Sequence, residues 1–153
     1  MLPTIPVSPK RLDDYAADAG DEAVERLREA ARPLVGARLL HINSTAFGGG
    51  VAELLLTHVA LLIDLGIETT WAVLEGSEDF FGVTKAMHNG LQGAEVAWTP
   101  EMESTYWGRI RANAAALDER YDLMFVHDPQ PAGLLAVLEE EGRRLGSSAD
   151  HEE

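Results

Sequence analysis

The stretch Arg38-Leu-Leu-His-Ile-Asn-Ser-Thr-Ala-Phe-Gly-Gly-Gly-Val-Ala-Glu53 decides the fold of this chain. A short apolar run leads through a small polar turn to three adjacent glycines, and apolar residues at helical spacing then continue to Leu65. This order predicts a buried strand, a glycine loop and a helix that begins near Gly50. Glycines adopt positive φ without strain, and the free N–H groups at a helix start attract anions.

The glycine loop is open to two interpretations. Its spacing matches neither G-x-G-x-x-G nor G-x-x-x-x-G-K-[ST], so it is neither the dinucleotide fingerprint nor a P-loop. A tight turn that packs a helix against a strand would also use glycines. The loop therefore predicts either a phosphate-binding corner at Gly48, Gly49 and Gly50 or a structural turn.

The rest of the chain extends this unit into an α/β fold. Residues 68–74 are rich in β-forming side chains, and residues 121–126 form another continuous apolar run. A strand, a helix and a strand joined in this way predict a parallel pair. Further helices are predicted within 21–33, 76–93, 98–120 and 132–141. The fold class is therefore a Rossmann-like parallel sheet with flanking helices.

Length and composition limit the class of protein. The chain has 153 residues, 46% of them hydrophobic, which suits one domain with a real core. It has no cysteine, so neither a disulfide nor a thiolate metal site is expected, and we predict no metal and no cofactor. The net charge of −14 argues against a nucleic-acid or anionic-membrane partner. No long apolar run or signal peptide occurs, which predicts a cytoplasmic protein.

The organisation along the chain is predicted from prolines and periodicity. Residues 1–20 hold three of the seven prolines and no sustained periodicity, which indicates an extended N-terminal arm. Residues 21–144 form the sheet domain. Periodicity ends after Arg144, so residues 145–153 are predicted to be a disordered tail.

Polar side chains gather on one predicted helix. Lys85, His88, Asn89 and Gln92 recur at steps of three and four residues, which places them on one helical face. Ammonium, imidazole and amide groups suit a polyhydroxylated or phosphorylated ligand, although a solvated helix face has the same composition. His58, on or beside an apolar stripe, is interpreted as a hydrogen-bonded packing residue rather than a ligand.

A second polar cluster follows the strand predicted over 121–126. His127, Asp128 and Gln130 come directly after it, between two prolines that stiffen the backbone. Ligands of open parallel sheets gather at the carboxyl ends of the strands. A buried Asp beside a His could bind sugar hydroxyls there. The alternative is an Asp that caps the next helix and a structural His.

Three motifs together resemble one enzyme family. They are His41-Ile-Asn-Ser-Thr-Ala-Phe-Gly-Gly-Gly-Val-Ala-Glu53, Phe80-Phe-Gly-Val-Thr-Lys85 with His88-Asn-Gly-Leu-Gln-Gly93, and Val126-His-Asp-Pro-Gln-Pro131. In this order they resemble the trehalose-forming retaining glycosyltransferases, the trehalose synthases of the glycosyltransferring type. Leu12-Asp-Asp-Tyr15 also resembles the N-terminal arm of that family, so the match runs from about residue 12 to residue 144.

The resemblance implies a GT-B architecture with two Rossmann-like domains, of which this chain would be an incomplete N-terminal, acceptor-side one. It implies transfer of glucose from a nucleoside diphosphate glucose to glucose. By resemblance, Gly48, Gly49 and Gly50 approach the donor phosphates, and Asp128 with His127 act at the transferred or acceptor sugar. Gln130, Lys85, His88 and Asn89 would bind sugar.

The resemblance also leaves alternatives. The family continues into a C-terminal domain with the donor phosphate clamp, which this sequence lacks, so the chain alone is expected to be inactive. It would need that C-terminal domain as a partner, and a homodimer is also expected because an incomplete sheet leaves an open edge. A catalytically inactive sugar-binding or vestigial module, or part of a retaining trehalose phosphorylase, fits the same motifs.

Overall fold

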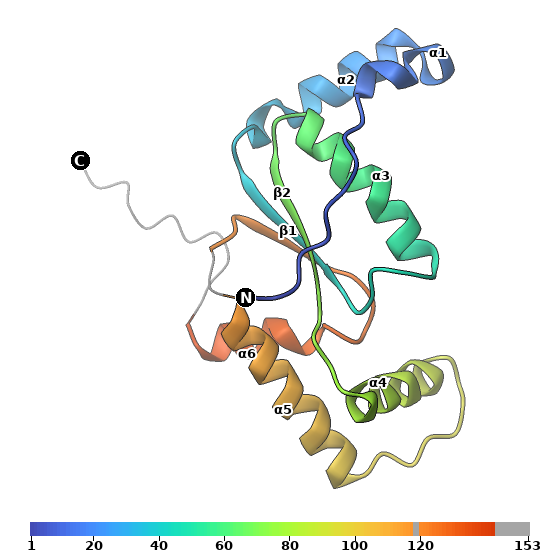
Figure 1. Cartoon of the computed structure of the whole chain (residues 1–153), viewed down its shortest axis with the longest axis vertical. Helices are drawn as coiled ribbons and strands as arrows, with labels where there is room; N and C mark the ends of the chain where they lie inside the picture. The colour runs from blue at the N-terminus through green and yellow to red at the C-terminus, as the bar shows by residue number, and fades with distance from the viewer. Residues whose placement is uncertain (118–119, 143–153) are drawn as a thin grey trace, which may run out of the picture.

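Three parallel strands form the centre of the molecule (Figure 1). The computed structural model describes residues 1–117 and 120–142. The strands are β1 (Arg38–Asn43), β2 (Glu68–Val73) and β3 (Leu123–Val126), in the order β2-β1-β3. The helices are η1 (Leu12–Tyr15), α1 (Ala16–Ala19), α2 (Asp21–Ala31), η2 (Arg32–Leu34), α3 (Gly50–Asp64), α4 (Glu78–Leu91), α5 (Pro100–Ala116) and α6 (Gly133–Glu140). The predicted Rossmann-like α/β class is confirmed.

The central position of β1 explains why its sequence decides the fold. It pairs with β2 from Arg38↔Glu68 to Asn43↔Val73 and with β3 from Leu39↔Leu123 to Ile42↔Val126. Because all three strands run the same way, the loops that follow them meet at one edge of the sheet. The predicted strand, glycine loop and helix are confirmed. The glycine loop lies at the same edge of the sheet as the loop that follows β3.

The two faces of β1 are buried against different helices. Leu40 and Ile42 belong to the core cluster that also contains Phe80 of α4, Ile110 of α5 and Leu134 of α6. On the other face, α3 packs on the sheet with Ala52, Leu55 and Val59 around Trp71. Side chains alternate between the faces of a strand, so residue 41 is directed to the α3 face.

The N-terminal arm differs from the prediction. It is extended only at its beginning, where Thr4 forms an antiparallel bridge with Ala72 of the edge strand β2. The predicted extended arm over 1–20 is wrong for its second half, because η1 and α1 make residues 12–19 helical. The N–H of Leu12 donates to a carboxylate oxygen of Asp64 at 2.8 Å, which fastens this turn to the end of α3.

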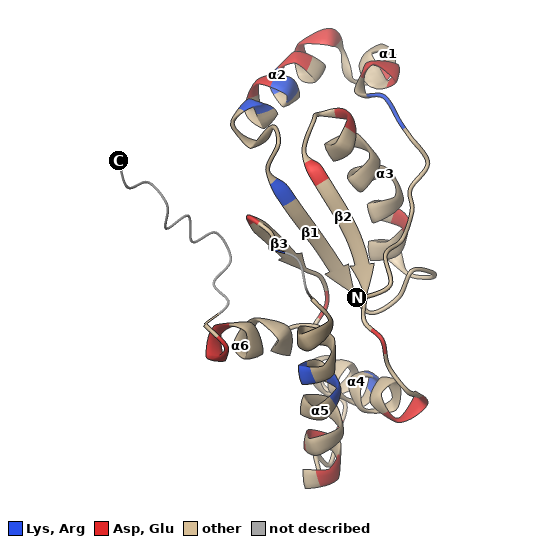
Figure 2. Cartoon of the chain, turned by 60° about the vertical axis from the view of Figure 1, so that its left-hand side comes forward, with Lys and Arg blue, Asp and Glu red and all other residues tan. Residues whose placement is uncertain are grey.

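Charged strand residues lie at the amino ends of the strands. Arg38 and Glu68 are register partners, and Asp122 directly precedes β3 and accepts a hydrogen bond from the N–H of Arg38 at 2.8 Å. Figure 2 shows these charges at the starts of β1, β2 and β3 and further charges along α1 and α2. The carboxyl ends of the strands, where a ligand would bind, carry no charge within the strands.

One face of β3 is poorly covered. Within the described residues β3 pairs only with β1, and Leu123 and Phe125 remain 39% and 49% exposed. These side chains face the same side of the sheet as His41, which α3 covers over β1 and β2. The predicted tail, residues 145–153, lies outside the described residues.

Asn113 of α5 holds the loop that leads from β2 to α4. Its side-chain carbonyl accepts from the N–H of Glu75 at 2.8 Å, and its amide donates to the carbonyls of Glu75 and Arg109 at 2.9 and 2.8 Å. The side chain is 2% exposed, so water cannot replace these bonds. A buried amide that satisfies a loop in this way fixes where α4 begins.

Asn113→Ala should therefore lower the free energy of unfolding by about 1–3 kcal/mol, because the N–H of Glu75 loses its partner. Chemical denaturation followed by circular dichroism measures this. The matched control is Asn89→Ala, the same change at an exposed position of α4, which should leave the unfolding midpoint unchanged. Equal losses in the two variants would contradict the role given to Asn113.

Candidate functional site

An open pocket of about 400 Å³ lies at the carboxyl edge of the sheet. Three segments far apart in the sequence line it: the turn after β1, helix α4 and the loop between β3 and α6. The lining residues are Ser44, Thr45, Phe81, Thr84, Lys85, His88 and Gln130. Of the residues predicted to bind sugar, Lys85, His88 and Gln130 are brought together here, and no carboxylate belongs to the lining.

Asn43 builds the β1 side of the pocket. Its side chain is 1% exposed, and its carbonyl oxygen accepts from the indole Nε1 of Trp71 at 2.9 Å. Its amide donates to the carbonyl of Thr45 at 2.7 Å. The hydroxyl of Thr45 in turn accepts from the N–H of Phe47 at 3.2 Å. The turn that presents Ser44 and Thr45 is thus fastened to the core through Trp71.

The glycine loop lies directly beyond this turn. Gly48 and Gly49 have φ values of 75° and 83°, a region that L side chains rarely adopt. A Cβ at Gly48, Gly49 or Gly50 would meet nothing within 4 Å, so the first two glycines serve the backbone conformation rather than close packing. Helix α3 begins at Gly50 after the N-cap residue Gly49, which has no side chain to cap the first N–H groups of the helix.

Helix α4 supplies the opposite wall. The Nε2 of His88 lies 2.9 Å from the side-chain nitrogen of Gln92, so the ring is oriented by its own helix. Thr84 is buried, and its hydroxyl donates to the carbonyl of Phe81 at 3.2 Å. Asn89 is exposed and, like Gln92, does not line the pocket, so Lys85 and His88 are the members of the predicted polar set that the structure brings to it.

The loop after β3 is held by a buried tyrosine. The hydroxyl of Tyr106 donates to the carbonyl of Gln130 at 3.2 Å and accepts from the N–H of Gly133 at 3.0 Å. Burial raises the pKa of Tyr106, so the hydroxyl keeps its proton. This clamp joins α5 to the start of α6 and fixes the backbone of the pocket residue Gln130.

Asp128 occupies a strained turn at the same edge. Its φ is 68°, and it is the non-glycine residue with positive φ among the described residues. Asp tolerates this region better than most residues, but the conformation still costs free energy. The sequence analysis assumed a buried Asp128, but the residue is exposed. It also does not line the pocket.

Three histidines meet on the α3 face of the sheet. Nδ1 of His41 lies 2.8 Å from Nε2 of His127, and the two ring planes differ by 13°. The ring of His58 on α3 meets that of His41 edge-on, with 5.3 Å between centroids. His58 itself is exposed, and its interpretation as a hydrogen-bonded packing residue stays a prediction.

Burial governs the ionisation of His41 and His127. Burial, together with smaller effects of the neighbouring His127 and His58, lowers the pKa of His41 from its ordinary value of 6.5 to about 4. Burial also lowers the pKa of His127, against the opposing effect of Asp128. Both rings are therefore neutral at neutral pH. No group of three or more His, Cys, Asp or Glu residues within the described ranges is arranged to hold a metal ion.

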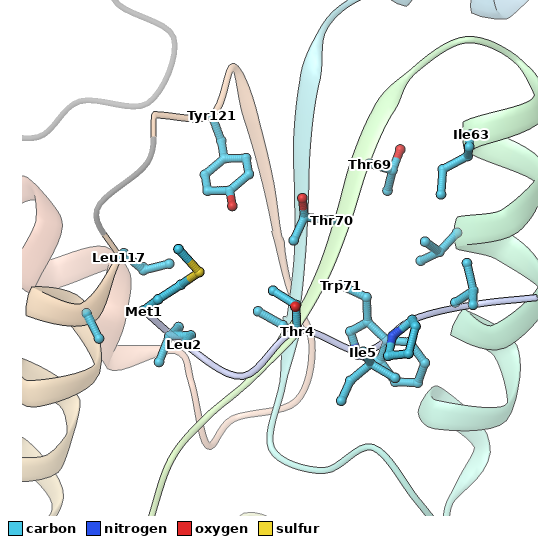
Figure 3. Close-up of a pocket in the computed structure, with 15 residues that line it drawn as sticks. Met1, Leu2, Thr4, Ile5, Ile63, Thr69, Thr70, Trp71, Leu117 and Tyr121 are labelled. Carbon is cyan, nitrogen blue, oxygen red and sulfur yellow. The ribbon is translucent and has the colours of Figure 1, made fainter.

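A second hollow of about 590 Å³ lies beside the N-terminal arm (Figure 3). Leu2, Ile5 and Trp71 line it together with Thr4, Thr69 and Thr70. Its lining contains no Asp, Glu, Lys, Arg or His side chain. In addition, no helix in the described part of the chain has the length and apolar content needed to cross a membrane.

Comparison with known proteins identifies the family. The sequence model described as "Trehalose synthase, N-terminal domain" matches residues 41–145, which include the glycine loop, α4 and the turn after β3. The chain belongs to the trehalose synthase family.

Members of this family resemble the chain over most of its length. It is 48% identical over 135 residues to the trehalose synthase of Rubrobacter xylanophilus and 46% identical over 132 residues to that of Pyrococcus horikoshii. These matches cover 86% and 85% of the chain and 32% of each relative. The trehalose phosphorylase of Pleurotus pulmonarius is 29% identical over 107 residues, 63% of the chain and 14% of that relative. The chain thus spans about a third of the trehalose synthases it matches.

Several residues that build this pocket were missed by sequence analysis. Ser44, Thr45 and Thr84 line the pocket, and Asn43 and Tyr106 hold its walls. The signal for Asn43 was a polar residue at the end of a buried apolar run, which Trp71 satisfies from the neighbouring strand. Tyr106 lies within the helix predicted over 98–120, but nothing in the spacing of that helix shows which groups its hydroxyl contacts.

The buried histidine pair predicts that stability falls in acid. The folded state keeps His41 neutral down to about pH 4, whereas the unfolded chain takes up its proton near 6.5. The stabilisation is therefore complete above pH 6.5 and decreases as the pH falls to about 4, by on the order of 3 kcal/mol. Urea unfolding midpoints across this range measure the loss. His41→Phe should flatten the slope, and an unchanged slope would contradict the assignment.

The turn at Asp128 predicts opposite effects for two substitutions. Asp128→Gly should leave the free energy of unfolding unchanged or raise it by up to about 1 kcal/mol, because glycine adopts positive φ without strain. Asp128→Val should lower it by about 1–2 kcal/mol, since a β-branched residue is penalised there. Thermal denaturation compares the two variants. A glycine variant less stable than the valine variant would exclude strain at this position.

Proposed function

We propose that this chain is the acceptor-side, N-terminal domain of a retaining GT-B glycosyltransferase that transfers glucose from a nucleoside diphosphate glucose to glucose, forming trehalose. The observation that carries the proposal is the pocket at the carboxyl edge of the sheet, where Ser44, Lys85, His88 and Gln130 converge from three segments. Membership of the trehalose synthase family supports a sugar as the ligand, and the polar lining of this pocket supports it as the binding site.

The chemistry of the pocket supports a neutral polyol. Hydroxyl, amide, imidazole and ammonium groups offer donors and acceptors in turn, which matches the alternating roles of sugar hydroxyls. The ring of Phe81 adds an apolar wall. A volume of about 400 Å³ lies within the usual range of small-molecule sites. The overall charge of −14 does not oppose this, because the lining has no carboxylate.

Roles are proposed for the predicted residues on this basis. Lys85, His88 and Gln130 bind the acceptor sugar, with Asn89 at the outer end of α4. Asp128 and His127, at the tip of the loop after β3, bind hydroxyls of the reacting sugars and so act in catalysis by orientation. Gly48, Gly49 and Gly50 present backbone N–H groups to the donor phosphates at the start of α3.

The match leaves about two thirds of each of these trehalose synthases uncovered. The trehalose synthases that match are about three times as long, since 32% of each is covered. We propose that a second domain of the GT-B type binds most of the donor across the cleft. The uncovered face of β3, with Leu123 and Phe125 exposed, supports contact with such a domain or with a second copy of the chain.

A complementation assay tests the proposal. The chain is mixed with the remaining C-terminal part of the Rubrobacter xylanophilus relative, nucleoside diphosphate glucose and labelled glucose, and trehalose is measured by chromatography. Trehalose is expected in the mixture and not from either part alone. Asp128→Ala should reduce the rate by about 100-fold or more, because an orienting contact to the reacting sugars is lost.

The control and the contrary result are defined by the same assay. Asp122→Ala, at the amino end of β3 and remote from the pocket, should form trehalose at the rate of the unaltered chain. Absence of trehalose from a mixture in which both parts are folded and associated, shown by sedimentation, would count against the enzymatic proposal. A folded chain that still binds glucose in a calorimetric titration would then be a sugar-binding module.

A trehalose phosphorylase activity is the second candidate. The match to the Pleurotus pulmonarius enzyme supports it, since that relative shares 29% identity over 107 residues. The glycine loop suits free phosphate as well as a diphosphate. Trehalose and inorganic phosphate supplied to the same mixture distinguish the two: release of glucose that depends on phosphate would favour the phosphorylase.

A further inference from the structure

The contact between His41 and His127 restricts where each ring carries its proton. Nδ1 of His41 and Nε2 of His127 are 2.8 Å apart, a hydrogen-bond distance, and the rings are nearly coplanar at 13°. A neutral imidazole has one N–H and one lone pair. One ring must therefore donate and the other accept, and the choice fixes the proton on the far nitrogen of each ring.

The far nitrogen of His41 decides between the two arrangements. His41 is 1% exposed, and its Nε2 is buried without a hydrogen-bond partner among the described residues. If His127 were the donor, the proton of His41 would be placed on Nε2 as a buried, unpaired N–H. If His41 is the donor, Nε2 carries only a lone pair. Buried unpaired N–H groups are the rarer and costlier defect in folded proteins.

The surroundings of His41 favour the neutral pair. Its ring stacks on Phe125 with 5.0 Å between centroids and 9° between planes, and it meets His58 edge-on. Those two rings and His127 bring no carboxylate to His41, and the lowered pKa of His41 agrees with a neutral ring. Asp128, which follows His127 in the sequence, affects the pKa of His127, which it raises.

We propose that His41 is a positioning residue that holds His127 as the Nδ1–H tautomer, so that His127 offers a hydrogen-bond donor to a sugar hydroxyl at the carboxyl edge of the sheet. His127 Nε2 is engaged by His41, and only Nδ1 is left for a ligand. Asp128 adds a carboxylate acceptor one residue further along. A donor and an acceptor side by side match a hydroxyl group, which both accepts and donates.

The sugar ligand in this inference rests on the proposed function, whereas the tautomer of His127 is a property of the chain without ligand. Without the restraint His127 could exchange between tautomers and offer either a donor or an acceptor. A neighbour that fixes the tautomer removes this ambiguity before the sugar arrives. The same arrangement is familiar from histidines oriented by a second group in hydrolytic and metal sites.

Nitrogen NMR of the ¹⁵N-labelled chain tests the tautomer directly. Long-range ¹H–¹⁵N spectra at neutral pH distinguish a protonated from an unprotonated ring nitrogen, and the signals of His127 are identified by their loss in His127→Gln. A proton on Nδ1 of His127 is expected. A proton on Nε2, or averaging between the two nitrogens, would overturn the inference.

Three variants separate positioning from simple packing. His41→Phe keeps a ring beside Phe125 but removes the donor, so His127 should lose the fixed Nδ1–H form. His41→Asn keeps an N–H near the place of Nδ1 and should restore it. His58→Phe, the matched control, removes the other neighbouring imidazole and should change nothing. An unaltered His127 tautomer in a folded His41→Phe chain would refute the role; if that variant does not fold, the native chain and His41→Asn decide.

Glucose titration connects the tautomer to binding. His41→Phe should weaken glucose binding by about threefold to tenfold, the loss of one hydrogen bond, and His41→Asn should restore it. Weaker binding with the His127 tautomer unchanged would reduce His41 to a structural residue. No glucose binding by the native chain would count against the proposed acceptor pocket, while the NMR spectra would still decide the tautomer.

Discussion

Backbone pairing of β1 with one parallel strand on each side is the constraint on which the rest of this structure depends. It brings the ends of β1 and β3 to one edge, although some 80 residues separate His41 from its register partner Phe125. Because the pairing is parallel, the polar turn after β1 and the strained turn after β3 must open in the same direction. Helix α4 then closes this edge, and the pocket exists only where the three segments meet.

Single buried polar side chains hold each wall of the pocket. Asn43 fastens the turn after β1 to Trp71, Asn113 fastens the start of α4 to α5, and Tyr106 fastens the loop after β3. Each lies in a region that is otherwise apolar, so an unsatisfied group would be costly, and each satisfies backbone groups of the loop it holds. The loops that line the pocket are thereby tied to the core, as the proposed transfer between two sugars would require.

The pocket differs in charge from the chain as a whole. The net charge is −14, yet strand charges gather at the amino ends and the pocket lining has no carboxylate. Burial lowers the pKa of His41 and of His127, so these two rings can act through hydrogen bonds at neutral pH rather than through charge. Polar groups that act mainly through directional hydrogen bonds support the proposed sugar ligand, because sugar hydroxyls both donate and accept.

Sequence by itself determined the elements and the family, because both are written in local order. The alternation of apolar runs with glycine predicted the strands and most helices, and three ordered motifs carried the resemblance. It erred over residues 12–19, where a contact from Leu12 to Asp64 stabilises a turn that local sequence does not reveal. It also treated the polar face of α4 as one set, although Asn89 lies outside the pocket.

Only the tertiary structure decided which side chains act together. The 2.8 Å contact of His41 with His127, the clamp of Tyr106 on Gln130 and the positive φ of Asp128 join residues or strain a backbone through the packing of distant segments. Periodicity reports which face of an element is apolar, but it carries no information on which polar atom of another element that face will meet. Such contacts between distant segments form only when strand register and helix packing are both established, and the site consists of these contacts.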